Sequence, residues 1–287
     1  MATNQMRREA AKRKLERQQQ RRIEQAHKRK RNVVITVVAV VAAVAVVAVV
    51  FALLPSGSGE PAPPPAAQAV TPASIPTEIA PMPKRAEALP ASVSCTYGPD
   101  PQGQAAARPV EPPPATGVST QGTATLTLQT TDGAIPMTLD RALAPCTVNS
   151  MISLAQQGYF DNTTCHRLTT APGLQVLQCG DPTGEGTGGP GYTTPDELVP
   201  GTKYGRGMLA MANTGAPDSG GSQFFIVYGD GSALDSRPTY TVFGSVGAEG
   251  LRVVDEIARR GHDGSLDPSP GGGKPVTPVT IEKAVVS

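Results

Sequence analysis

Apolar and polar residues alternate through much of the C-terminal half of the chain, and this alternation predicts β-strands. Neighbouring residues of a strand point to opposite faces of the sheet, so apolar residues at every second position place one apolar face against a core. Two such runs, joined by the turn-forming sequence TTDG, predict a β-hairpin over residues 123–140. Their apolar positions are Ala124, Leu126 and Leu128 in the first run, and Ile135, Met137 and Leu139 in the second. Further strands are expected near residues 165–168, 174–178, 207–212, 223–228, 240–246 and 279–286, which makes about eight strands in all.

Two segments carry their apolar residues at helical spacing instead. The apolar stripes are Val148, Met151, Ile152, Leu154 and Ala155 within residues 147–158, and Leu251, Val254, Ile257 and Ala258 within residues 250–261. Thr147 is expected to cap the first helix and Gly158 to end it. Gly261 is expected to end the second helix, after two arginines that suit the C-terminal end of the helix dipole.

Strands therefore predominate, with two helices between them and long loops rich in Gly and Pro. This order of elements predicts the all-β class. The expected architecture is an eight-stranded closed antiparallel barrel with two helices that cap it.

A different pattern occupies residues 33–54, an apolar run of 22 residues with no charge. As a helix this run is about 33 Å long, enough to cross a bilayer core of about 30 Å. It predicts one transmembrane helix over residues 32–54. A cleaved signal peptide is the alternative, although the apolar core of such a peptide is shorter, roughly 7–15 residues. A buried helix of a soluble domain is disfavoured, because valine at this density is a poor choice for a helix in water.

The charge of the chain is strongly asymmetric. Residues 1–31 hold 12 Lys and Arg and 3 Glu, a net charge of +9, and the remainder of the chain carries −8. Basic residues beside a membrane span stay cytoplasmic, so we expect a basic cytoplasmic tail over residues 1–31 and a C-terminal part on the extracytoplasmic face. The same charges attract anionic headgroups. We expect no nucleic acid as a partner.

Residues 55–117 are rich in Pro and Ala and predict an extended, semi-rigid tether. The folded domain is expected over residues 118–287, a length sufficient for one sizeable core.

All four cysteines, Cys95, Cys146, Cys165 and Cys179, follow the apolar run. An even count on the outer face of a membrane suggests two disulfides, and four cysteines allow three connectivities. We favour Cys165–Cys179, because these residues flank a plausible hairpin, which leaves Cys95–Cys146 to join the tether to the start of a helix. Buried free thiols are the alternative. The spacings match no common zinc pattern.

The folded domain lacks the residue patterns of the common hydrolytic and cofactor-dependent sites. It contains no G-x-S-x-G sequence and no P-loop, and its two histidines, His166 and His262, do not form a metal-ligand cluster with other residues. The glycine-rich sequence GEGTGGPG is interpreted as a tight surface loop. What remains is a set of neutral polar and apolar groups with one arginine, Arg167, beside an apolar run. This set of residues suits simple binding, or a reaction that uses no nucleophile and no proton transfer. No cluster suggests a catalytic metal.

Five stretches, in order along the chain, resemble the cyclophilins, a family of peptidyl-prolyl isomerases with an eight-stranded barrel and two helices. They are Tyr159–Leu168, Leu177–Tyr192, Gly207–Gly215, Gly220–Ile226 and Tyr240–Val246. With its basic tail, apolar run and cysteines, the chain resembles the membrane-anchored cyclophilins of actinobacterial envelopes. The resemblance implies an isomerase that acts on Xaa-Pro segments of secreted or envelope proteins and needs no cofactor.

The resemblance also implies roles for individual residues. Arg167 corresponds to the catalytic donor, Phe225 to the floor of the proline pocket and Gln178 to a catalytic amide. Phe224 is expected to face the core. The residues that correspond to substrate-binding positions are His166, Val176, Ala212, Asn213, Gln223, Leu234 and Tyr240.

The chain departs from the family pattern at three informative positions. Cys165 stands where an aromatic residue is usual. Gln175 stands where the family places a phenylalanine of the proline pocket. As a wall of the pocket it predicts a less apolar pocket and lower activity; a position in a solvent-facing loop is the alternative. Ala233 replaces a tryptophan that favours cyclosporin, so weak cyclosporin binding is expected. A proline-binding chaperone with little turnover and a scaffold that docks an envelope partner therefore stay open as alternatives.

Overall fold

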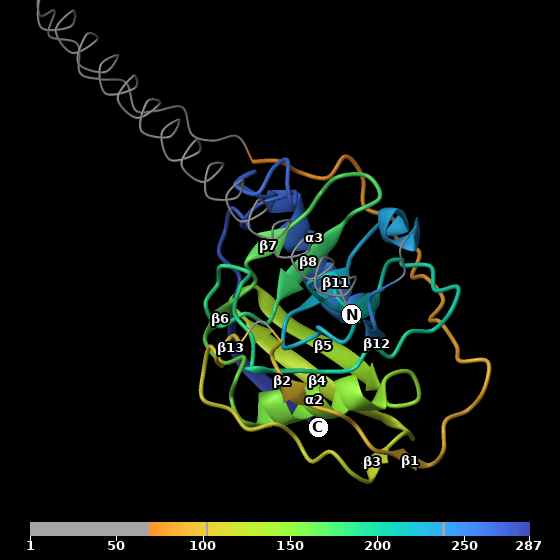
Figure 1. Cartoon of the computed structure of the whole chain (residues 1–287). Helices are drawn as coiled ribbons and strands as arrows, with labels where there is room; N and C mark the ends of the chain where they lie inside the picture. Colours follow the sequence, from red (N-terminus) through yellow and green to blue (C-terminus); the bar gives the residue numbers. More distant parts are fainter. Residues whose placement is uncertain (1–68, 102, 237–238) are drawn as a thin grey trace, which may run out of the picture. The chain divides into compact units, whose positions relative to one another are not determined.

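A computed structural model of the chain describes residues 69–287, apart from residues 102 and 237–238. The described part is built on a nine-stranded antiparallel sheet with the strand order β6-β13-β4-β5-β12-β10-β11-β8-β7 (Figure 1). The strands are β4 (Thr123–Thr130), β5 (Gly133–Asp140), β6 (Thr163–Thr164), β7 (Arg167–Leu168), β8 (Val176–Cys179), β10 (Met208–Met211), β11 (Phe224–Val227), β12 (Val242–Val246) and β13 (Thr280–Val286).

The predicted hairpin is confirmed as β4 and β5, which pair along their whole length. The six apolar positions that alternate along the two strands are all buried, and they face each other across the ladder in register, Leu126 opposite Met137 and Leu128 opposite Ile135. Each of the other predicted strand segments also contains a strand of this sheet. The alternation in the sequence therefore located the core face correctly.

The expected closed eight-stranded barrel differs from the structure, in which β6 and β7 are the two outermost strands of an open ladder. Only two residues, Cys165 and His166, lie between these edge strands, so the chain cannot turn back to pair them. The two edge strands follow one another along the chain through Cys165 and His166. An isolated bridge between Thr164 and Asp181 and the Cys165–Cys179 disulfide connect this segment to β8 and the residues after it. The sheet is curled, and its ladder is not closed among the described residues.

The two helices, α2 (Pro145–Gln156) and α3 (Ala248–Arg260), lie at opposite ends of the curled sheet in Figure 1. A short 3-10 helix, η1 (Ser232–Ser236), follows β11. The predicted stripe of α3 is fully buried, and Gly261 ends this helix with a φ of 81°, a left-handed conformation that favours glycine. Both predicted helices are thus confirmed, α2 with a different start.

Thr147 does not cap α2, which begins two residues earlier at Pro145. The carboxylate of Glu197 takes the place of the cap. It accepts hydrogen bonds from the backbone N–H groups of Cys146 and Thr147, at 2.9 and 2.8 Å, and from the Thr147 hydroxyl at 2.8 Å. A carboxylate at this end also suits the helix dipole. The partner lies 50 residues away in the sequence, so local pattern could not reveal it.

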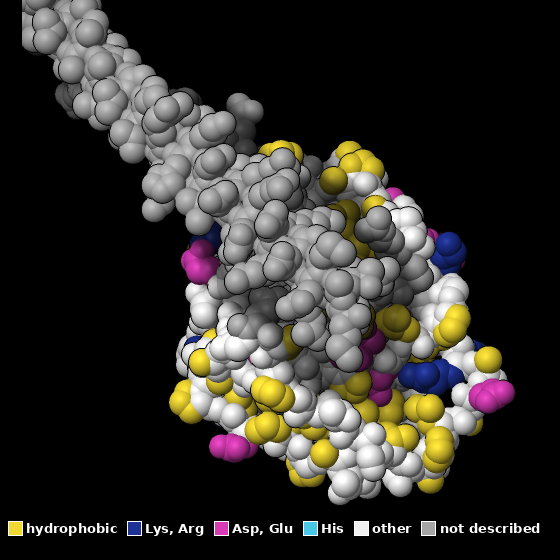
Figure 2. Space-filling view, viewed as in Figure 1, with side chains coloured by type: hydrophobic (Ala, Val, Ile, Leu, Met, Phe, Trp, Pro, Cys, Tyr) yellow, Lys and Arg dark blue, Asp and Glu magenta, His cyan; other side chains and the backbone are white. Residues whose placement is uncertain are grey.

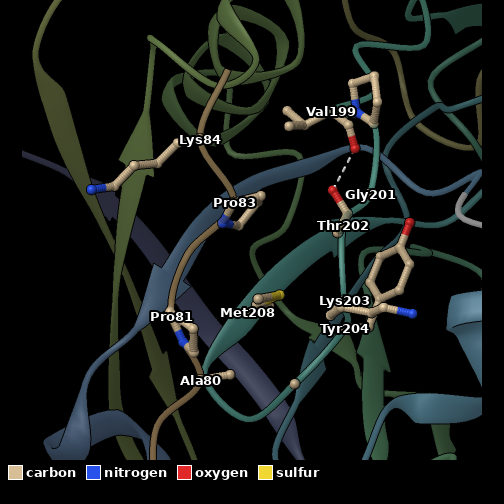
Figure 3. A pocket seen from close by; sticks show the side chains of 12 residues that line it. Ala80, Pro81, Pro83, Lys84, Val199, Gly201, Thr202, Lys203, Tyr204 and Met208 are labelled. Carbon is tan, nitrogen blue, oxygen red and sulfur yellow. Dashed lines mark hydrogen bonds between the residues drawn. The ribbon is translucent and has the colours of Figure 1, made fainter. Parts of the chain in front are cut away.

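Residues 69–117, the described part of the tether predicted over residues 55–117, lie along the folded domain. Strand β1 (Ser92–Val93) pairs with β3 (Val118–Ser119), and β2 (Gly98–Pro99) pairs with β9 (Tyr192–Thr193). Further toward the N-terminus, residues 80–84 enclose a cavity of about 330 Å³ with residues 199–205 and Met208 (Figure 3). The segment therefore contributes backbone pairing and packing to the domain from residue 70 on.

Both favoured cysteine pairs are present, Cys95 with Cys146 and Cys165 with Cys179, with sulfur atoms 2.04 and 1.98 Å apart. The first pair joins residues 69–117 to the start of α2. The second joins the segment between β6 and β7 to the end of β8.

No helix within the described part of the chain is long and apolar enough to span a membrane. The predicted span over residues 32–54 and the basic tail lie outside the described residues. On the face seen in Figure 2, neutral polar and apolar side chains cover most of the visible surface of the described residues, and the fewer acidic and basic side chains are interspersed.

Candidate active site

Three adjacent strands bring the three predicted catalytic residues onto one rung of the sheet. Arg167 of β7 is directly opposite Gln178 of β8, and Gln178 is directly opposite Phe225 of β11. Residues that face each other across antiparallel strands project to the same side of the sheet, so these three side chains share one face. Phe224 points to the other face, where its ring packs edge-on against Phe160 with ring centroids 5.9 Å apart. As predicted, Phe224 thus points into the core and Phe225 points toward the site.

A cavity of about 480 Å³ opens on this face. Nine of the ten predicted site residues line it: His166, Arg167, Val176, Gln178, Ala212, Asn213, Phe225, Leu234 and Tyr240. The tenth, Gln223, lines an adjoining cavity of about 390 Å³, which also contains Gln178, Ala212 and Asn213. The structure therefore gathers all ten residues along one continuous groove.

The floor of the first cavity is aromatic. The ring of Phe225 lies against that of Tyr240, with centroids 5.3 Å apart and planes at 86°. Tyr240 is held in turn by Tyr204, whose hydroxyl donates to the Tyr240 carbonyl at 2.8 Å and accepts from the Tyr240 N–H at 3.1 Å. With Val176 and Leu234 alongside, these rings form an apolar pocket of the kind that accepts a small apolar ring.

Arg167 is fixed at the rim of this pocket by three hydrogen bonds. Its Nε donates to the carbonyl of Gly271 at 2.9 Å, and one terminal nitrogen donates to the carbonyl of Pro270 at 2.8 Å. The other terminal nitrogen donates to Oε1 of Gln178 at 3.2 Å. A guanidinium has five N–H donors in a fixed planar fork, so these bonds set its plane and leave donors for a further acceptor.

A chain of side-chain amides continues from Arg167 along the groove. Gln178 donates from Nε2 to Oε1 of Gln223 at 2.9 Å, and Gln223 donates from Nε2 to the carbonyl of Gly188 at 3.0 Å. Because each amide accepts on one side and donates on the other, the orientation of both is determined. Gln178 lines both cavities and Gln223 lines the second, and each amide has a further lone pair and N–H group beyond these bonds.

Burial shifts the ionisation of the two basic residues in the first cavity. It lowers the pKa of Arg167, which the nearby Tyr240 and Asp267 partly offset. Burial also lowers the pKa of His166, against the opposing charge of Asp181 and in the same direction as the charge of Arg167. Neither ring nitrogen of His166 has a hydrogen-bond partner among the described residues, although the side chain is buried at the cavity wall. His166 is therefore a neutral ring at neutral pH, and the fixed positive charge of the site belongs to Arg167.

Gln175 takes neither of the two positions left open by the sequence, because it does not line the pocket and is not exposed to solvent. Its side chain is buried on the opposite face of the sheet edge, where Nε2 donates to the carbonyl of Ser74 at 2.7 Å and Oε1 accepts from the N–H of Asp230 at 2.8 Å. Leu174 lines the cavity in its place. The first cavity is therefore more apolar than a wall formed by Gln175 would make it, and Gln175 serves to attach residues 69–117 to the domain.

Sequence reasoning missed several other residues of the cavity. Leu266 and Pro270 come from the loop between α3 and β13, and Glu185 comes from the glycine-rich loop after β8. Glu185 pairs with Lys274 at 3.2 Å, so the two loops meet beside the site. The sequences of these loops, rich in Gly, Pro and Asp, gave a turn signal but no signal that pointed to the groove.

The groove combines an apolar pocket, a fixed cation at its rim and a row of neutral amides. Within the described residues, no group of three or more His, Cys, Asp and Glu is placed to hold a metal ion. The form of such a groove suits an extended peptide, and the cation lies where it can donate to a group beside the pocket.

The family model described as cyclophilin type peptidyl-prolyl cis-trans isomerase/CLD matches residues 125–286. This chain belongs to the cyclophilin family. The relatives of this cyclophilin include "Probable peptidyl-prolyl cis-trans isomerase B" of Mycobacterium leprae, 46% identical over 203 residues, and the protein of the same name of Mycobacterium tuberculosis, 45% identical over 206 residues. The matches cover 66% and 67% of this chain, and the chain spans 65% and 64% of the length of these two relatives. "Peptidyl-prolyl cis-trans isomerase A" of Mycobacterium tuberculosis is 37% identical over 182 residues, which cover 58% of this chain and 93% of that protein.

Proposed function

We propose that this cyclophilin is a peptidyl-prolyl cis-trans isomerase that accelerates the folding of secreted or envelope proteins. The observation that carries the proposal is the single rung of Arg167, Gln178 and Phe225 across three strands, which sets a fixed cation beside an apolar pocket. Family membership supports the same reaction.

The reaction needs stabilisation of a twisted amide and no covalent step. Rotation about the C–N bond of a peptide has a barrier of roughly 18–20 kcal/mol, because conjugation between nitrogen and carbonyl is lost at the transition state. The prolyl nitrogen then becomes pyramidal and carries a lone pair. A donor aimed at this nitrogen binds the twisted form more tightly than the planar one, which is the condition for catalysis.

Arg167 is the donor in this proposal. Its bonds to Pro270, Gly271 and Gln178 hold the guanidinium at the rim of the pocket, so little reorganisation is needed when the substrate twists. The ring of the substrate proline lies against Phe225, between Val176 and Leu234. Gln223 and the backbone of Asn213 hold the flanking amides while the acyl side rotates. His166, Ala212 and Tyr240 complete the walls, and no cofactor takes part.

The binding-only alternative rested on a polar residue inside the proline pocket. Leu174 lines the pocket and Gln175 does not, so a polar pocket wall no longer supports this alternative.

Two further proposals concern the whole chain. The first is that the protein crosses the membrane once, with residues 33–54 as the span, the N-terminal tail in the cytoplasm and the isomerase domain outside. The charge asymmetry of the chain and the two disulfides support this location. Cyclosporin binding is weak, because Ala233 is exposed and offers no aromatic surface at the rim.

The test is the exchange rate between cis and trans forms of an Ala-Ala-Pro-Phe peptide, measured by NMR with the full chain and with Arg167→Ala. Uncatalysed exchange takes roughly 10–100 s at 25 °C, so modest acceleration is visible. We expect fast exchange with the wild type and a loss of about 100-fold or more in the variant. If the folded wild type does not accelerate exchange, the proline-binding chaperone with little turnover becomes the favoured function. A co-purifying envelope partner retained by the variant would favour a scaffold.

A further inference from the structure

The second cavity of the groove is partly built by residues outside the region that matches the family. Its inner part consists of residues shared with the proline pocket, among them Gln178 and Asn213. Its outer wall includes Asp100 and Gln104, whereas the family match begins at residue 125. A peptide that occupies the proline pocket and continues along the shared residues therefore meets a wall that lies outside the region matched by the family model.

This wall is attached by a series of backbone bonds. Strand β2 pairs with β9, with Pro99 opposite Tyr192. Beyond it, the N–H of Asp100 donates to Gly191 at 3.2 Å, and the N–H of Ala107 donates to Gly189 at 2.8 Å. The contact is close enough that a Cβ added at Gly191 would lie 2.9 Å from the nitrogen of Ala106.

A side-chain bond completes the attachment. The amide of Gln104 donates from Nε2 to the carbonyl of Thr187, in the glycine-rich loop that lines both cavities. The wall is therefore a constructed part of the groove, joined to it on either side of Asp100.

The charge of the second cavity is set by one residue. Asp100 is the single charged side chain among the described residues that line it; the others are Gly, Pro and Ala, or neutral polar and tyrosine side chains. Asp100 is half-buried, where solvent screens its charge less than on open surface. At the other end of the groove stands the cation of Arg167. The first cavity also contains Glu185, which is paired with Lys274 at 3.2 Å. The second cavity, whose charged lining is Asp100 alone among the described residues, is therefore the part of the groove that attracts a cationic side chain.

We propose that Asp100, with Gln104, forms a subsite for a lysine or arginine side chain of the client, near the proline in sequence. The inference rests on the proposed isomerase function and names a preference within it. Clients with a basic residue at that position turn over faster than clients with an alanine or a glutamate there.

The test is a lysine scan of a short Xaa-Pro peptide, with lysine, alanine or glutamate placed in turn at each of three positions on either side of the proline. The quantity compared is the ratio of kcat/KM for lysine and alanine peptides, measured with the full chain. At one position we expect a ratio of about 5, the size that a partly exposed ion pair supplies. The ratio falls toward 1 in Asp100→Asn and as salt is raised. In Asp100→Lys the preference reverses, and the glutamate peptide becomes the better substrate.

Glu282→Gln is the matched control, because it removes the same charge from an exposed position on β13. It leaves the ratio unchanged. Equal ratios in wild type and Asp100→Asn, or no reversal in a folded Asp100→Lys, would overturn the subsite while the isomerase function stands. No acceleration of any peptide by the wild type would instead overturn the function itself.

Discussion

The Nε of Arg167 donates to the backbone carbonyl of Gly271 at 2.9 Å, although the two residues are 104 positions apart in the sequence. The loop that supplies this carbonyl is bonded to β7 by two backbone hydrogen bonds between Leu168 and Gly273, at 2.8 and 3.1 Å. Within the loop, the carboxylate of Asp267 accepts from the N–H of Gly272 at 2.7 Å. The orientation of the guanidinium thus depends on the internal order of a loop that follows α3.

Removing the Asp267 carboxylate is expected to lower turnover. In Asp267→Ala the Gly272 N–H loses its acceptor, the loop carbonyls shift, and the guanidinium moves from its position. A misplacement of about 1 Å can cost on the order of 100-fold in rate, so we expect kcat/KM to fall about 10-fold to 100-fold. Asp267→Asn keeps an acceptor oxygen and retains most of the turnover. The measurements are peptide exchange and the NMR signal of the Arg167 Nε–H.

Asp140→Ala is the control for this prediction. It removes a bond of the same kind, from the Ala142 N–H to the Asp140 carboxylate at 2.8 Å, far along the chain from the loop. Its turnover should equal that of the wild type. An Asp267→Ala protein with full turnover and an unchanged Arg167 signal would show that the loop does not position the guanidinium.

Acid is expected to destabilise the fold through His262. Its Nδ1 accepts from the Gly264 N–H at 3.0 Å, and its Nε2 bonds to the Thr170 hydroxyl at 3.0 Å. Burial lowers its pKa below the ordinary 6.5, and the charge of Arg167 acts in the same direction, while Asp263 and Asp267 oppose the shift. The folded chain therefore takes up this proton at lower pH than the unfolded chain.

The unfolded chain binds more protons between pH 6.5 and the folded pKa, so the free energy of unfolding falls as pH falls through this window. His166, whose pKa is also lowered by burial, contributes with the same sign. Urea unfolding from pH 8 to pH 5 measures the effect. In His262→Gln the decline below pH 6.5 should be shallower; an unchanged slope in this variant would assign the decline to other groups.

Alternation predicted the face of each strand, and it would also have placed Leu174 correctly. Counting back by two from Gln178 reaches Val176 and then Leu174, all three of which line the groove. The family resemblance instead directed attention to Gln175, one residue out of phase with that face. The period of two was the better guide here, because a side chain cannot cross the sheet to reach a pocket on its other side.

Long-range contacts made by backbone groups had no signal in the sequence. The carbonyls of Pro270 and Gly271 hold Arg167, and any residue type supplies a carbonyl. The replacement of the Thr147 cap by Glu197 is a similar case, since a single Glu in a loop is compatible with many roles. The motif-bearing strands were predictable, whereas the loops that orient their side chains were not.

Replacing the buried amide of Gln175 is expected to reduce stability and leave the pocket intact. In Gln175→Leu the N–H of Asp230 and the carbonyl of Ser74 lose their partners, which costs about 1–3 kcal/mol of the free energy of unfolding. Turnover of a short peptide should stay near that of the wild type, because Gln175 does not line the groove. Gln157→Leu is the control: this exposed amide bonds to the backbone of Glu111, and its loss should cost much less. A marked loss of turnover in folded Gln175→Leu would place the amide back at the pocket.

The two disulfides are expected to differ in what they support. Cys95–Cys146 closes a loop of 51 residues and Cys165–Cys179 one of 14, so in the chain-entropy model their removal costs about 4 and about 3 kcal/mol respectively. Loss of Cys165–Cys179 should lower turnover more than loss of Cys95–Cys146. Cys165 directly precedes His166 and Arg167 on the chain, and Cys179 directly follows Gln178, whereas the longer loop ends at the start of α2.

The experiment compares the paired variants Cys95→Ala with Cys146→Ala, and Cys165→Ala with Cys179→Ala, by urea unfolding and by peptide exchange. The first pair should show the larger drop in the free energy of unfolding, with turnover near that of the wild type. The second should show a smaller drop in stability and a clear loss of turnover, because the β7 end of the rung formed by Arg167, Gln178 and Phe225 is no longer tied to β8. Wild type treated with dithiothreitol should show both losses together. If the second pair keeps full turnover, the ladder bonds between β7 and β8 suffice to hold Arg167 opposite Gln178.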